Sequence, residues 1–127
     1  MSQRSILQAT ALVLALAFAG AATAADVRVS CEKRTNRSKA SVDGNNLAAG
    51  SYRAVLRSGG KSVTTPYATA VGDEAEFDFD SRAADIAEGA TAIPPQFIVD
   101  GRVRGYLVNS ANQRVTPVVE AICRVRS

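Results

Sequence analysis

The sequence predicts an all-β protein: a small disulfide-closed antiparallel β-sandwich of the immunoglobulin-like kind, or a barrel, of roughly seven to eight strands. Three observations support this fold class. Alternating segments separated by turn residues recur at intervals of roughly ten residues. Residues 74–80 alternate small or aromatic side chains with carboxylates, the pattern of a strand with an aromatic inner face and an acidic outer face. The two cysteines, Cys31 and Cys123, lie near opposite ends of the domain.

The first 24 residues have the pattern of a bacterial secretory signal peptide. Arg4 supplies the positive charge, residues 6–20 are almost uninterruptedly apolar, and Ala22 and Ala24 form a small-residue cleavage site. A retained membrane anchor is the alternative, but the run is short for the hydrocarbon core and no charged stop follows it. Cleavage after Ala24 leaves one domain, residues 25–127, without a membrane anchor, in the periplasm or outside the cell.

The two cysteines are expected to form a disulfide. An even cysteine count in an exported chain favours a bridge, and there is neither the Cys-x-x-Cys spacing of a redox motif nor a histidine. Both cysteines fall in alternating segments with aliphatic neighbours on the same face, so both sulfurs are expected to point inward. Bridging Cys31 to Cys123 therefore brings the first and last strands together.

The first half of the domain is predicted as three strands. Residues 27–34 and 38–42 alternate, and the turn formers of residues 43–46 end the second strand. Residues 52–57 form the third strand, which is followed by a Gly59-Gly60 hairpin turn.

The chain then returns over residues 63–71. Because Pro66 cannot donate to a β-ladder, this strand is expected at an edge or with a bulge. Two interpretations are open for residues 82–88: a helical turn capped by Ser81 and stopped by Gly89, or an irregular crossover.

The last third is predicted as a loop and three strands. Residues 90–95 are loop, and the apolar residues 96–100 form a short strand that ends in an Asp-Gly turn. Strands over residues 102–108 and 115–125 follow, separated by a polar turn, and Pro117 predicts an edge or a bulge in the last one.

Composition argues against an enzyme. The chain has no histidine, which excludes Ser-His-Asp and Cys-His arrangements and most zinc, copper or nickel sites. The disulfide uses both thiols. A carboxylate pair is what remains, but a bare strand face lacks the apolar pocket that raises the pKa of a catalytic acid. We expect no catalytic residue and no cofactor.

Charge is unevenly distributed along the chain. Residues 73–88 carry seven acidic residues and one basic residue, whereas the segments on either side are basic. The acidic strand has three interpretations: a solvated outer face, a docking face for a basic partner protein, or part of a Ca²⁺ site. The candidate partner face consists of Glu74, Glu76, Asp78 and Asp80, and the candidate Ca²⁺ ligands are Asp78, Asp80 and Asp85.

Arginines outnumber lysines by twelve to three and are spaced to point outward on strands. The candidate anion-facing residues are Arg53, Arg57, Arg102 and Arg104. Arginine suits bidentate contacts with phosphate or carboxylate, and the alternative is that these side chains pair with the acidic strand. Aromatic residues for base stacking are scarce, so nucleic acid is not an expected partner.

Together these features predict an exported, non-catalytic binding or accessory module. It is expected to contact an unknown protein or an anionic envelope component through an edge strand or through the acidic face at residues 73–88. Two alternatives remain: an inhibitor of a secreted hydrolase that presents the connection over residues 83–95 as a protruding loop, and a Ca²⁺-stabilised surface module.

Overall fold

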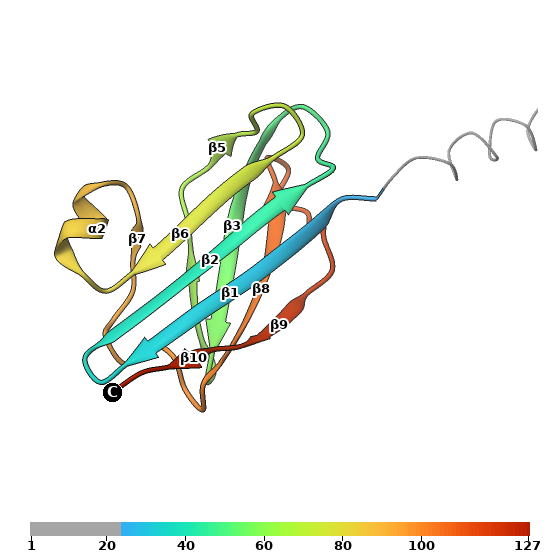
Figure 1. Ribbon diagram of the computed structural model, residues 1–127. Coiled ribbons are helices and arrows are strands. Elements are labelled where there is room, and N and C mark those ends of the chain that lie inside the picture. The colour runs from blue at the N-terminus through green and yellow to red at the C-terminus, as the bar shows by residue number, and fades with distance from the viewer. Residues whose placement is uncertain (1–23) are drawn as a thin grey trace, which may run out of the picture.

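The computed structural model describes residues 24–127, so the predicted signal peptide lies outside the described residues apart from Ala24. The described chain forms two packed five-stranded β-sheets and one short helix (Figure 1). Sheet A contains, in spatial order, β10 (Arg124–Val125), β1 (Asp26–Arg34), β2 (Arg37–Asn45), β6 (Ala75–Asp80) and β7 (Thr91–Ala92). Sheet B contains β4 (Lys61–Thr64), β3 (Ser51–Ser58), β8 (Arg102–Asn109) and β9 (Val119–Ile122), with β5 (Ala68–Thr69) also paired to β3. Helix α2 spans Ala83–Ala87.

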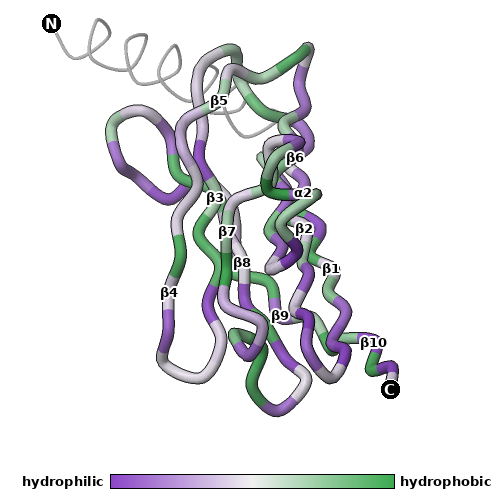
Figure 2. The backbone as a smooth tube through the Cα atoms, turned by 90° about the vertical axis from the view of Figure 1, so that its left-hand side faces the viewer, coloured by the Kyte–Doolittle hydropathy of each residue, from purple (hydrophilic) through white to green (hydrophobic). Residues whose placement is uncertain are grey.

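The strand pairing confirms the predicted all-β, disulfide-closed fold. Strand β2 pairs with β6, and β3 pairs with β8, so each sheet joins strands that are far apart in the sequence. In the immunoglobulin-like scheme these pairs correspond to strand B with E and strand C with F. Figure 2 shows the two sheets as separate layers, so the fold is the sandwich rather than the barrel.

The core lies between the inner faces of the sheets. Strand alternation buries Leu56 of β3, Leu107 of β8 and Val42 of β2, all with no exposed surface. Phe79 of β6 and Phe97, in the loop between β7 and β8, are the largest fully buried side chains. Burial of each such side chain stabilises the fold by about 1.5–3 kcal/mol.

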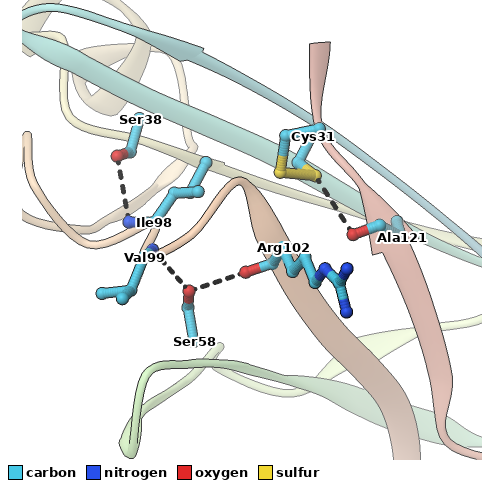
Figure 3. Close-up of a disulfide and its surroundings, with 8 residues drawn as sticks. Cys31, Ser38, Ser58, Ile98, Val99, Arg102 and Ala121 are labelled. Carbon is cyan, nitrogen blue, oxygen red and sulfur yellow. Dashed lines mark hydrogen bonds between the residues drawn. A yellow bond between two sulfur atoms is a disulfide. The ribbon is translucent and has the colours of Figure 1, made fainter. Parts of the chain in front are cut away.

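The predicted disulfide is confirmed, and it lies where the chain changes sheets. Cys123 separates β9 of sheet B from β10 of sheet A, and it is bonded to Cys31 of β1 with 4.6 Å between the two Cα atoms (Figure 3). Strand β10 then pairs in parallel with β1, so the first and last strands are neighbours as expected. One side of the sandwich is thus closed covalently.

Several sequence predictions were wrong in detail. Residues 91–92 of the predicted loop form β7, paired with β6. Strand β2 continues to Asn45, and the turn begins only at Asn46, which has φ +56°. Residues 96–100 do not form a strand, although Phe97 and Ile98 are buried. Two buried hydroxyls satisfy this segment instead: Ser38 Oγ accepts from the Ile98 amide at 3.2 Å, and Ser58 Oγ accepts from the Val99 amide at 2.8 Å (Figure 3).

The helix begins differently from the prediction. Its N-cap is Arg82, which has no side-chain capping bond, whereas Ser81 Oγ accepts from the Ser38 amide at 3.1 Å. The predicted stop is present, because Gly89 has φ +114° after the helix.

Two Thr-Pro pairs interrupt the edges of sheet B. Thr65 Oγ1 accepts from the Ala54 amide of β3 at 2.9 Å, and Pro66 then separates β4 from β5. Thr116 Oγ1 accepts from the Leu107 amide of β8 at 3.0 Å, ahead of Pro117 and β9. The threonine hydroxyl thus replaces a backbone acceptor at each break. These breaks confirm the edge positions that the prolines predict, and they blunt both edges of sheet B.

Gly105 of β8 lies where the two sheets pack closely against each other. A Cβ atom on Gly105 would lie 2.9 Å from Val42 Cγ2 and 3.0 Å from Val29 Cγ2. We expect Gly105→Ala to lower the free energy of unfolding by about 1–3 kcal/mol, because branched side chains on two strands must shift. Urea denaturation measures this change; a midpoint equal to that of the original protein would contradict the close packing.

Candidate functional site

Strand β6 has the two faces that its sequence predicts. Phe77 and Phe79 point into the core, with 5% and 0% of their surface exposed, whereas Glu76 and Asp78 are exposed. The strand pairs antiparallel with β2 along its whole length, from Gly44 opposite Ala75 to Lys39 opposite Asp80. Glu74 lies just before the strand, exposed, in a bridge with Val71.

Asp80 departs from the prediction of four solvated carboxylates. It is 2% exposed, and Arg37 holds both of its oxygens, through Nε at 3.0 Å and through Nη2 at 2.7 Å. Burial alone would raise the pKa of the Asp80 carboxyl, but the hydrogen bonds from Arg37 and from the Arg82 amide outweigh it and hold this pKa below its usual value. Asp80 is therefore part of the protein's framework and is not available to a partner.

The candidate Ca²⁺ ligands are not assembled into a metal site. Arg37 contacts Asp80 and lies 3.4 Å from Asp85, which also accepts from Arg82. Asp78 instead accepts from the Ser41 hydroxyl at 2.9 Å. Within residues 24–127 no group of three metal-ligating side chains has the arrangement of an ion site.

The side of β6 that faces away from β2 is paired only at its end. Strand β7 contacts β6 in parallel at Phe79 and Asp80, and the Ile93 amide donates to the Asp80 carbonyl at 3.0 Å. The Asp80 backbone therefore points away from β2. Because backbone groups alternate along an antiparallel strand, those of Glu76 and Asp78 point the same way. In the described chain no strand pairs with that stretch.

A groove runs along this open edge, between sheet A and sheet B. Its volume is about 500 Å³, and its opposite wall is the interrupted β4–β5 segment, residues 65–68. Its lining is mainly apolar and acidic, with Lys39 as its one basic residue; it includes Pro66, Ala68, Phe77, Glu76, Asp78 and Glu88. In an immunoglobulin-like sandwich this position, beside strand E, is taken by strand D.

The groove edge has a strongly negative environment. Asp43 of β2 lies directly opposite Glu76. Burial raises the pKa of the Asp43 carboxyl, and the carboxylates of Glu76 and Asp78 raise it further. Like charges on opposed positions repel one another, so a cation placed at this edge would be stabilised.

The arginines lie on a different surface from the acidic strand. Arg53 and Arg57 of β3 and Arg102 and Arg104 of β8 project from the outer face of sheet B. Their polar contacts are with Asn112, Tyr106 and Glu120. The alternative prediction that they pair with the acidic strand is wrong.

The connection over residues 83–95 protrudes only in part. Helix α2 has no buried residue and stands at the side of the sandwich in Figure 1. Beyond it, β7 joins sheet A and Ile93 is 4% exposed in the core. This segment does not have the form of an extended inhibitory loop.

Sequence reasoning missed Arg37 and the tyrosines Tyr67 and Tyr106, over whose rings arginines lie. Arg37 and Asp80 are 43 residues apart, so only the register of β2 on β6 brings them together. For the tyrosines the alternation of β8 gave a partial signal, since it places Tyr106 on the same face as Arg104.

No protein-family model, curated protein or solved structure matches this chain. Across residues 24–127, no helix combines the length and the apolar composition needed to cross a membrane.

Proposed function

We propose that this chain is an exported, non-catalytic binding module that accepts an extended segment of a partner protein as an added strand along β6. The observation that carries the proposal is the open edge at Glu76 and Asp78, which lies beside a groove of about 500 Å³. Strand addition obtains its affinity from main-chain hydrogen bonds and its specificity from alternate side chains. Both are available at this edge.

The other edges of the sandwich are poorer candidates. Thr-Pro breaks interrupt both edges of sheet B. At the opposite edge of sheet A, β10 pairs with β1 only at Glu32 and Lys33, but β9 lies against β1 and the disulfide holds the crossover from β9 to β10 beside it. Such devices prevent unwanted strand pairing. The stretch of β6 from Ala75 to Asp78 contains no proline and keeps regular strand geometry, so it is suited to a specific partner.

The side chains of β6 indicate what the partner looks like. An added strand alternates in step with β6, so every second side chain faces the sandwich interior beside Phe77 and the others lie beside Glu76 and Asp78. The proposed partner segment therefore alternates apolar with basic residues. Opposite charges across a strand pair contribute about 0.2–1 kcal/mol each, and like charges destabilise.

Export is part of the same proposal. The secretory pattern of residues 1–24 supports it, and the Cys31–Cys123 bridge is consistent with an oxidising compartment. The partner is accordingly expected in the periplasm or outside the cell.

A short peptide in which arginine alternates with valine tests the proposal. We expect the protein to bind it measurably by calorimetry and to bind the matching glutamate–valine peptide at least about tenfold more weakly, because charges of the same sign then face each other. Equal affinity for the two peptides, or no binding of the arginine peptide, would contradict the proposal.

The variant Asp78→Pro separates edge pairing from simple charge attraction. It removes an outward N–H that the β2–β6 ladder does not use, so the fold is expected to persist while peptide binding is lost. Asp78→Asn is the matched control, since it removes the same charge but keeps the N–H. We expect this control to retain most of the binding, and equal loss in both variants would count against strand addition.

A further inference from the structure

The outer face of sheet B forms a second surface with unusual composition. Apart from Ser51 at the start of β3, its outward residues on β3 and β8 are arginine, valine and tyrosine: Arg53, Val55, Arg57, Arg102, Arg104, Tyr106 and Val108. We call these residues the arginine face. Arginine and tyrosine are enriched at protein–protein interfaces, where lysine and acidic residues are depleted.

Two guanidinium groups of the arginine face are held in place by aromatic rings. The Arg53 guanidinium lies 4.7 Å from the centre of the Tyr67 ring and donates to Asn112 Oδ1 at 2.6 Å. The Arg57 guanidinium lies 5.5 Å from the centre of the Tyr106 ring and donates to its hydroxyl at 3.1 Å. Stacking limits the freedom of these side chains without neutralising their charge.

The positive charge of this face is largely uncompensated. Arg57 and Arg104 lie directly opposite each other in the β3–β8 pairing, an arrangement that costs stability. Arg104 pairs with Glu120 at 3.7 Å, an exposed pair of little strength, and Asp100 lines the same surface hollow without a salt bridge among the described residues. Among the described residues Arg53, Arg57 and Arg102 form no salt bridge.

The face also has an apolar floor. Val55 and Val108 point outward, yet they are only 8% and 6% exposed because the arginines and tyrosines cover them. Val118 and Ile122, at the β9 side, are 42% and 80% exposed. Two adjoining hollows, of about 500 and 780 Å³, share Arg57, Ser62 and Val118 in their walls.

From these observations we propose that the arginine face is a docking surface for an acidic protein surface, independent of strand addition at β6. Guanidinium groups held on rings keep their charge and further N–H donors for carboxylates beyond the contacts with Asn112 and Tyr106. The exposed Val118 and Ile122 supply apolar contact area of the kind that protein interfaces use and that a sulfated polysaccharide could not use. Charge complementarity then fixes the partner's orientation and favours encounter.

Binding of polymers of stated composition tests this proposal. The probes are a copolymer of glutamate and tyrosine, polyglutamate, heparin and vesicles of phosphatidylglycerol, compared near physiological salt. We expect the glutamate–tyrosine copolymer to bind most tightly. Tighter binding of heparin or of the vesicles, or no binding of the copolymer, would overturn the assignment to an acidic protein.

Paired variants locate the binding on the arginine face. Arg57→Ala with Arg104→Ala is expected to weaken copolymer binding by on the order of tenfold or more. The matched control removes the same charge from sheet A, as Arg28→Ala with Arg34→Ala, and is expected to change binding less than about twofold. Equal weakening in both pairs would overturn the proposal in favour of non-specific attraction.

A third pair, Arg57→Lys with Arg104→Lys, keeps the charge and is the least disruptive to folding. We expect it to lose most of the binding, because lysine lacks the planar fork of donors. Full binding by this pair would contradict a role for fixed guanidinium groups.

Discussion

Replacing Cys31 and Cys123 together with alanine is expected to lower the free energy of unfolding by about 4 kcal/mol. The bridge closes a loop with a sequence separation of 92 residues, almost the whole described chain, and it holds the crossover from β9 to β10 against β1. For a domain of this size the loss corresponds to a fall in Tm on the order of 15 °C or more.

Thermal unfolding followed by circular dichroism, with and without a strong reductant, measures this effect. The original protein is expected to melt at a lower temperature in reductant, and the double alanine variant is expected to melt at one temperature in both conditions. If the Tm of the wild-type protein is the same with and without reductant, the bridge contributes nothing to stability.

Arg37→Ala is expected to destabilise the fold by about 3 kcal/mol, because it leaves the Asp80 carboxylate buried without its partner. The side chains of Arg37 and Asp80 are 14% and 3% exposed, so solvent cannot replace the lost contact. Arg82→Ala is the control: its ion pair with Asp85 is exposed and is expected to contribute less than about 1 kcal/mol. Urea denaturation of the two variants makes the comparison, and equal losses would contradict a framework role for Asp80.

The same ion pair predicts a pH dependence. The pKa of Asp80 is lower in the folded protein than in the unfolded chain, so its stabilisation is complete above the unfolded pKa of about 3.9 and is lost as the pH falls through the folded pKa. Asp80→Asn removes this contribution. The stability difference between the original protein and this variant should therefore shrink below about pH 4, and a difference that stays constant through this range would contradict the assignment.

The sequence predicts local features of this fold better than long-range ones. Neighbouring residues alone predict the alternation of residues 74–80 and the Gly59-Gly60 turn. The presence of just two cysteines predicts the Cys31–Cys123 bridge. Alternation tells which side chains share a face but not what covers that face. Asp80 was therefore predicted to be solvated, although Arg37 covers it in the folded protein.

The periodicity of the sequence does not predict the order of the strands in the sheets. Residues 96–100 have the composition of a strand, yet Ser38 and Ser58 from distant strands satisfy their backbone. The open stretch of β6 likewise depends on β7 being short and on β4 lying in the other sheet. The sequence predicts that an edge strand or the acidic face is the contact surface. The structure shows that the outward backbone groups of Glu76 and Asp78 in β6 have no partner strand among the described residues.

Hydrogen exchange at the amides of β6 tests the central claim most directly. In the free protein the amides of Phe77 and Phe79, which face β2, are expected to exchange slowly, whereas those of Glu76 and Asp78 exchange fast. Adding the arginine–valine peptide is expected to protect Glu76 and Asp78 specifically. Amides at Glu76 and Asp78 that are already protected in the free protein, or that stay fast when the peptide is bound, would contradict strand addition at this edge.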